Sequence, residues 1–83
     1  MPINSFKFAI CINNSNCDDL ELLKVYPILP DSSAEQDNYI RIIDESGEDY
    51  LYPQNYFTLI NVSPAEEEQL RLVLSQSRLS ENL

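Results

Sequence analysis

The stretch "DYLYPQNYFTLI", residues 49–60, decides the fold, because a proline and a polar pair interrupt an aromatic, strand-like segment. Pro53 has no N–H to donate to a sheet ladder, so a strand that begins at Asp49 should end there. The next residues, Gln54–Tyr56, suit a single 3₁₀ turn, which seldom runs longer than three or four residues. Phe57–Ile60 then resumes as a short strand. The sequence therefore predicts a corner that redirects the chain, as closure of a small β-barrel requires.

A tight hairpin is predicted just before this corner. Tyr39–Asp44 is rich in β-branched and aromatic residues, which favours a strand. The turn at Glu45–Glu48 contains Gly47, the only glycine in the chain. Glycine takes the positive φ that tight hairpin turns commonly need. We therefore expect Asp49–Tyr52 to turn back and pair with Tyr39–Asp44.

Further strands are predicted upstream of the hairpin. Phe6–Ile12 alternates in a way typical of a half-buried strand. One face carries Phe6, Phe8, Ile10 and Ile12, and the other carries Lys7, Ala9 and Cys11. A polar loop at 13–19 leads to a turn and a second strand at Leu23–Leu29, although the start of this segment could also form one helical turn. Pro27 predicts an edge strand or a bulged one, and 30–38 is predicted as a second polar loop.

The C-terminal segment has the pattern of a helix. Ser63 at the N-cap, Pro64 in the first turn and Glu66 at the third position form a capping box. An apolar stripe follows at Leu70, Val73 and Leu74. We expect this helix to end near Ser75, with a flexible tail at 76–83. Packing on the barrel, over one open end, is the preferred interpretation; a dimer contact or a docking helix is the alternative.

Length and charge limit the classes of function. A chain of 83 residues forms one domain with a small core. Five Lys and Arg against fourteen Asp and Glu give a net charge of −9. Such a surface repels nucleic-acid backbones and anionic lipids, and it favours basic partners. One hypothesis is therefore an acidic accessory subunit that docks on a larger enzyme or basic protein.

Catalytic motifs are missing from the sequence. The chain has no histidine, which is the commonest general base, and a single glycine excludes a glycine-rich phosphate loop. Cys11 and Cys17 do not form a C-x-x-C motif, so a redox pair is less favoured than two free thiols, with Cys11 a small apolar strand residue. We expect neither a secretory leader nor a membrane-spanning segment, because the N-terminal residues are polar and no run approaches about 18 apolar residues. We expect a non-enzymatic, cytoplasmic protein without a cofactor.

Four carboxylates flank the hairpin turn. Asp44, Glu45, Glu48 and Asp49 lie within six residues and could attract a hard cation such as calcium. Their spacing does not fit the EF-hand loop, and charges at a turn are often simply solvated. We assign no metal ligand, and a metal-binding regulatory protein stays an alternative.

The order of strand, glycine hairpin, strand and the run from Tyr52 to Phe57, "YPQNYF", resembles the end of a Src homology-3 (SH3) domain. The segment at 20–29 is similar to that family's turn into its second strand, so the resemblance spans about residues 6–62. It implies a mainly β fold, a small five-stranded SH3-like barrel at 1–62 with one C-terminal α-helix at 63–75. The chain has no tryptophan, which the proline-binding signalling members carry near the position of Tyr39. It therefore looks closer to small bacterial proteins with this barrel.

A partner-binding surface follows from the resemblance and from charge. It comprises Tyr39, Pro53, Asn55, Tyr56 and the acidic loop residues Asp18, Asp19 and Glu21. Exposed tyrosine gives large contact area at low entropy cost, and the acidic residues could attract an arginine. We expect Tyr50 and Tyr52 to fill the core and Tyr56 to be exposed. The sequence thus favours a protein–protein interaction module, as a monomer or a weak homodimer.

Overall fold

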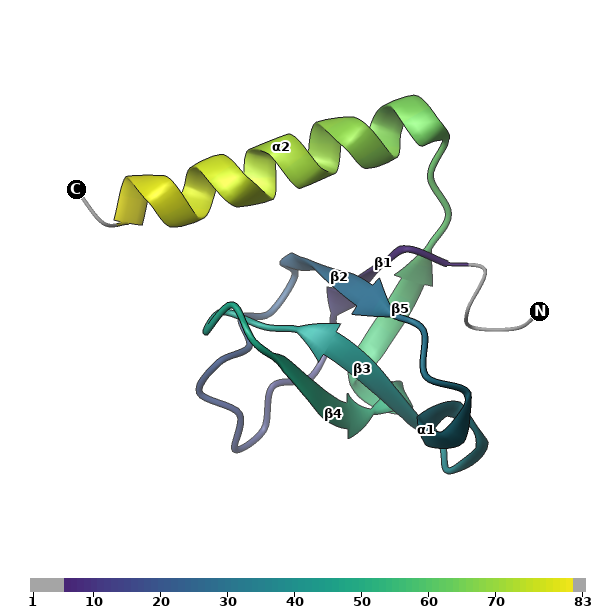
Figure 1. The fold of residues 1–83 in the computed structure, drawn as a ribbon. Coiled ribbons are helices and arrows are strands. Elements are labelled where there is room, and N and C mark those ends of the chain that lie inside the picture. The colour runs from purple at the N-terminus through teal and green to yellow at the C-terminus, as the bar shows by residue number, and fades with distance from the viewer. Residues whose placement is uncertain (1–5, 82–83) are drawn as a thin grey trace.

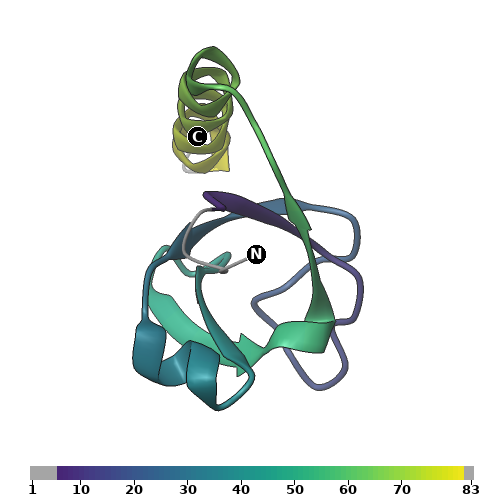
Figure 2. The same ribbon diagram turned by 90° about the vertical axis from the view of Figure 1, so that its right-hand side faces the viewer.

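The computed structural model describes residues 6–81, and for 75–81 it describes the backbone alone. In chain order the elements are β1 (Phe8–Cys11), β2 (Val25–Leu29), α1 (Ser32–Gln36), β3 (Tyr39–Ile43), β4 (Asp49–Pro53), the 3₁₀ turn η2 (Gln54–Tyr56), β5 (Phe57–Ile60) and α2 (Pro64–Glu81). The five strands form one antiparallel sheet in the order β4-β3-β2-β1-β5 (Figure 1). The sheet curls around an interior, with α2 outside it (Figure 2). Its edge strands β4 and β5 are not paired with each other in this sheet, so the fold is a mainly β, open sheet with a C-terminal helix.

The predicted corner at Pro53 is confirmed. β4 ends at this proline, η2 follows over three residues, and β5 begins directly after it. The N–H of Gln54 donates to the carbonyl of Asn38 over 3.0 Å, and its side-chain amide donates to the carbonyls of Glu35 and Tyr39. These bonds fix the corner to the connection between α1 and β3.

The predicted hairpin is confirmed as well. β3 and β4 pair with Ile43 opposite Asp49 at the turn. Gly47 has φ 84°, and its N–H donates to the carbonyl of Asp44 over 3.0 Å. Glycine populates this region without steric cost, which explains its place at the reversal.

β1 is buried on both faces, so the expectation of a half-buried strand is wrong. Ala9 and Cys11 point into the core and are fully buried, which confirms Cys11 as an apolar strand residue. The core cluster consists of Ala9, Cys11, Leu20, Tyr26, Ile28, Ile40, Ile42 and Phe57. Phe8 is also fully buried but lies outside that cluster. The outer face of β1 therefore needs a cover of its own.

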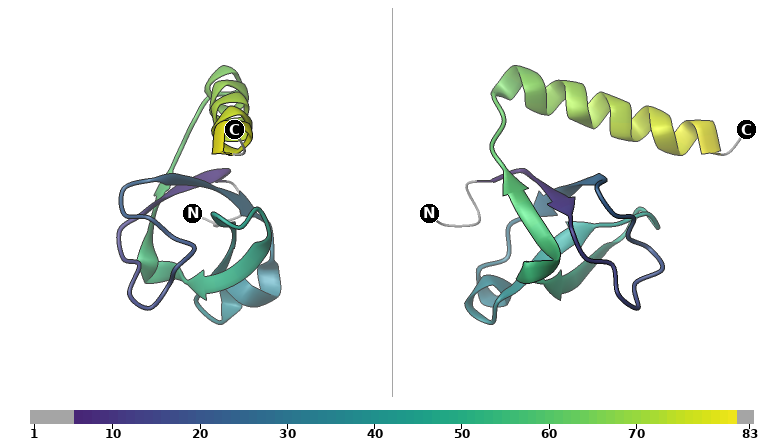
Figure 3. Two further views of the ribbon diagram at one scale, coloured as in Figure 1. Left: turned by 90° about the vertical axis from the view of Figure 1, so that its left-hand side faces the viewer. Right: turned by 180° about the vertical axis from the view of Figure 1, so that it is seen from behind.

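α2 supplies this cover. The helix runs along the outer side of β1 rather than over an open end of the sheet (Figures 1 and 3). The guanidinium carbon of Arg71 lies 5.4 Å from the centre of the Phe8 ring. Leu70 and Leu74 are half-buried, whereas Val73 is 59% exposed, so the predicted apolar stripe is wrong at Val73.

The start of α2 follows the prediction and its end does not. The N–H of Glu66 donates to Ser63 Oγ, and the N–H of Ser63 donates to Glu66 Oε1, which is a complete capping box. The helix continues past Ser75 to Glu81, because no proline or glycine interrupts it. The expected tail at 76–83 is therefore helical as far as Glu81, and its last two residues lie outside the described part.

β2 is a central strand, so the edge-strand interpretation of Pro27 is wrong. The N–H of Ile28 donates to the carbonyl of Lys7, on the β1 side, over 2.9 Å. Successive residues of a strand point their N–H groups to opposite sides, so the missing N–H of Pro27 faces β3. The pairing of β2 with β3 begins only at Ile28. The proline therefore removes no hydrogen bond from the ladder.

The loop predicted at 30–38 contains the short helix α1. Asp31 caps it, since its carboxylate accepts from the N–H of Ala34 over 3.1 Å. The same carboxylate pairs with Arg41 of β3 at 2.8 Å, and Arg41 also pairs with Asp49 of β4. Side chains of opposite charge thus connect α1 to both strands of the hairpin.

Candidate functional site

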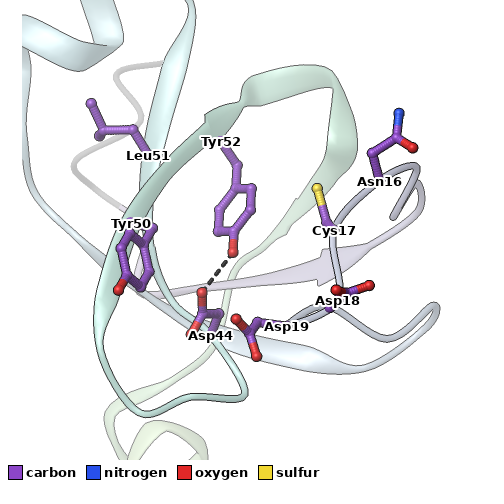
Figure 4. Close-up of a pocket in the computed structure, with 8 residues that line it drawn as sticks. All are labelled: Asn16, Cys17, Asp18, Asp19, Asp44, Tyr50, Leu51 and Tyr52. Carbon is purple, nitrogen blue, oxygen red and sulfur yellow. Dashed lines mark hydrogen bonds between the residues drawn. The ribbon is translucent and has the colours of Figure 1, made fainter.

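A pocket of about 350 Å³ lies between the loop that joins β1 to β2 and the edge strand β4 (Figure 4). It is lined by Asn16, Cys17, Asp18, Asp19, Asp44, Tyr50, Leu51 and Tyr52. The loop contributes two carboxylates, and β4 contributes two aromatic rings. This volume falls within the range of small-ligand sites.

Asp44 forms one end of this pocket and has a structural role. Its side chain is only 1% exposed and accepts from the Tyr52 hydroxyl at 2.6 Å. The other carboxylate oxygen accepts from the hydroxyl and the N–H of Ser46, at 2.5 and 3.0 Å. A buried carboxylate needs such donors to offset its lost hydration. Burial, and then the bond to Asp44, raise the pKa of Tyr52 above its usual value.

The two tyrosines of the pocket differ in burial. Tyr52 packs against the core cluster and lies 6.1 Å from the Phe57 ring, so the prediction that it fills the core is confirmed. Tyr50 is 49% exposed, and the same prediction is wrong for it. It lies near the start of β4, an edge strand that pairs only with β3 in the described sheet. The negative charge of Glu48 is the main cause that raises the pKa of Tyr50.

The acidic residues of the loop line the same pocket as these rings. Asp18 and Asp19 are exposed, and no ion pair in the described part of the chain involves either of them. The nearby Lys24 is held by Glu21 at 3.3 Å and by Glu45 at 2.9 Å. Lys24 is therefore already paired with two carboxylates, and Asp18 and Asp19 give the pocket an anionic rim.

Three hydrogen bonds hold the loop in place. The N–H of Glu45 donates to the carbonyl of Asp19 over 2.9 Å. The Tyr26 hydroxyl donates to Glu45 Oε2 at 2.6 Å and accepts from the N–H of Glu21 at 2.8 Å. Burial, followed by this bond to Glu45, raises the pKa of Tyr26 well above its usual value. The loop is thus attached to the β3–β4 turn through backbone and hydroxyl groups.

The four carboxylates of the hairpin point to different partners. Asp44 bonds Tyr52 and Ser46, while Asp49 pairs with Arg41. Glu48 accepts from the Tyr50 hydroxyl, and Glu45 pairs with Lys24. Within residues 6–81, no three His, Cys, Asp or Glu side chains are grouped so that they could hold a metal ion.

The predicted partner-binding residues occupy separate places. Asp18 and Asp19 line the pocket, but Glu21, Tyr39, Pro53, Asn55 and Tyr56 do not. Tyr39 lies directly opposite Pro53 in the β3–β4 pairing. The side chains of Tyr39 and Asn55 are both exposed. Tyr56 is half-buried against the core cluster, so it is less exposed than predicted.

Sequence reasoning missed most of the pocket wall. Asn16, Cys17 and Leu51 carry no motif, and the sequence predicts that Tyr50 fills the core rather than lining a pocket. The acidic run on both sides of the turn was the available signal, since a strand that starts at a charged turn begins near solvent. Recognising the facing loop required the tertiary structure.

The cysteines give no sign of a redox site. Both Cys11 and Cys17 are free thiols, the first buried and the second half-buried. Burial raises the pKa of the Cys11 thiol, which lowers its thiolate fraction and its reactivity.

No protein-family model, curated protein or solved structure matches this chain. The SH3 resemblance therefore stays a prediction from the sequence. In the described part of the chain, no helix has the length and apolar character to cross a bilayer.

Proposed function

We propose that this protein is a non-enzymatic interaction module on an SH3-like small barrel, and that it binds a basic segment of a partner protein. The pocket between the loop and β4 takes the cationic side chain. One observation carries the proposal: Asp18 and Asp19, which form no ion pair in the described chain, line the same pocket as Tyr50 and Tyr52.

Arginine is the side chain that suits this arrangement best. A guanidinium pairs with carboxylates through several N–H groups and stacks on aromatic rings. Tyr50 offers an exposed ring, and Asp18 and Asp19 offer carboxylates on the facing wall. The barrel part of the proposal is supported by the strand order and by the 3₁₀ turn between β4 and β5, where the sequence resemblance places it.

The test uses a short fluorescent peptide that alternates arginine and serine. The double variant Asp18→Asn/Asp19→Asn should bind it roughly tenfold more weakly, because the ion pairs inside the pocket are lost. A matched control, Asp37→Asn/Glu68→Gln, removes the same charge from exposed positions elsewhere in the chain. Its affinity should stay close to that of the unchanged protein at physiological salt, where distant charges are screened.

A second candidate is the acidic accessory subunit. It is favoured by the excess of fourteen acidic over five basic residues, and by the ion pairs that already engage Lys24, Arg41 and Arg71. A protein held by its overall field would lose affinity equally in both double variants. Equal losses would therefore reject the pocket and support the accessory subunit.

A further inference from the structure

Apolar side chains stand in solvent at the base of the same loop. Ile12 is 50% exposed, Leu22 54% and Leu23 79%. The backbone of Cys11 bonds to Leu23, which brings the end of β1, and with it Ile12, beside the turn. We call these three residues the apolar ridge.

Leu23 has an unusual backbone conformation. Its φ is 65°, in the left-handed region that a side chain with Cβ disfavours. Its N–H donates to the carbonyl of Cys11 over 2.7 Å, while the N–H of Cys11 donates to the carbonyl of Lys24 over 3.0 Å. Leu23 and Lys24 thus oppose a single residue, which is a β-bulge whose first position normally holds glycine.

Leucine is unfavourable here in two independent ways. The backbone conformation favours glycine, and the leucine side chain is 79% exposed, so little of its apolar surface is buried within the chain. Neither fold stability nor solubility explains a leucine at this position. An outlier of this kind points to a function outside the folding of the chain.

We propose that the apolar ridge docks an apolar side chain of the same basic partner segment whose cation enters the pocket. This inference rests on the proposed function and extends it from one contact to two. The partner is then a segment of another protein in which basic and aliphatic residues are close neighbours. The ridge anchors the aliphatic residue, and the pocket anchors the basic one.

Distance and charge support this occupant. Leu22 follows Asp19 by three residues, so their Cα atoms are at most about 11 Å apart. A few residues of extended chain span that distance. The carboxylate of Asp19, which forms no ion pair in the described chain, lies three residues before Leu22 of the ridge and would attract a flanking basic residue. A second copy of this chain, with its charge of −9, is repelled instead.

The test compares two fluorescent peptides of equal charge, one alternating arginine with leucine and one alternating arginine with serine. The leucine peptide should bind roughly tenfold more tightly, because it buries apolar area on the ridge. In Leu23→Gly this preference should shrink severalfold, while affinity for the serine peptide is unchanged. The melting temperature of Leu23→Gly should equal or exceed that of the unchanged protein, since glycine fits the bulge.

A matched control is Leu72→Asn, which removes an exposed leucine from α2. It should keep the full preference for the leucine peptide. Equal binding of both peptides, with both weakened by Asp18→Asn/Asp19→Asn, would reject the ridge and leave the pocket standing. Binding of neither peptide would reject the proposed function itself. A lower melting temperature for Leu23→Gly, or self-association that depends on Leu23 in sedimentation, would also overturn the inference.

Discussion

Two segments lie outside the curled sheet, α2 and the loop between β1 and β2, and they are held in different ways. α2 covers the fully buried Phe8, with the guanidinium of Arg71 over the Phe8 ring. The loop is held by hydrogen bonds to Glu45 and Tyr26 as well as by Leu20, which is buried in the core cluster, and it leaves Leu22 and Leu23 in solvent. Hydrogen bonds through the backbone and the Tyr26 hydroxyl therefore hold the loop while Leu22 and Leu23 stay available for a partner.

The largest effect should come from breaking the apolar side of this comparison. Phe8→Ala removes a fully buried ring between β1 and α2, and it should lower the free energy of unfolding by about 3–5 kcal/mol. Urea unfolding measures this loss. Val73→Ala removes an exposed side chain of α2 as a control and should cost less than about 0.5 kcal/mol. Similar losses in the two variants would mean that α2 does not cover Phe8 in solution.

A smaller loss is expected on the polar side. Tyr26→Phe removes the hydroxyl that joins Glu45 to the N–H of Glu21, and it should cost about 1.5–3 kcal/mol because the acceptor is charged. Tyr39→Phe removes a hydroxyl from an exposed tyrosine and serves as the control. Hydrogen exchange should then speed up at the Glu21 amide in Tyr26→Phe alone. Unchanged protection of that amide would contradict the proposed attachment of the loop.

The same hydroxyls predict the response to alkaline pH. Because the pKa values of Tyr26 and Tyr52 are raised in the folded protein, their contribution is fully present below about pH 10, the value of unfolded tyrosine. Above it the unfolded state loses protons that the folded state keeps, so stability falls as pH rises. In the double variant Tyr26→Phe/Tyr52→Phe, the free energy of unfolding should fall less steeply between about pH 9 and pH 11, the range around the pKa of unfolded tyrosine. An equally steep fall would assign the effect to other groups, such as Lys24.

The smallest effect should come from Arg71. Arg71→Ala removes the cation over the Phe8 ring and should cost about 0.5–1 kcal/mol, as the side chain is half-exposed. Glu67→Gln breaks the ion pair to Arg71 and leaves the ring contact intact, so it should cost less. The difference between the two unfolding free energies then isolates the contact with the ring. A larger loss in Glu67→Gln would show that the ion pair, rather than the ring, positions Arg71.

The sequence predictions were accurate for features that depend on adjacent residues and less accurate for features that depend on residues far apart in the sequence. The turn at Gly47, the corner at Pro53 and the capping box at Ser63 were predictable, because each depends on the backbone chemistry of a few adjacent residues. The central position of Pro27 was not, since it depends on where β2 changes its partner from β1 to β3. The helix at Ser32–Gln36 was missed although its Asp31 cap was visible, because the polar composition favoured a loop.

The candidate site was predicted only in part for the same reason. Asp18 and Asp19 were expected to attract a cation from their charge and loop position alone. That Tyr50 faces them, while Tyr52 bonds to the buried Asp44, depends on residues far apart in the sequence. The exposed Leu23 in a glycine-type bulge had no sequence signal, since a leucine at the start of a predicted strand is ordinarily a core residue.

The sequence by itself determined the strands, their turns, the acidic surface and the start of the C-terminal helix, because local backbone preferences and net charge need no distant partner. The tertiary structure decided which faces are buried. It placed α2 on the outer side of β1 and set the acidic loop against β4, leaving Tyr50 and Leu23 in solvent. Burial depends on which segments meet in space, and in this small protein one helix and one loop decide it.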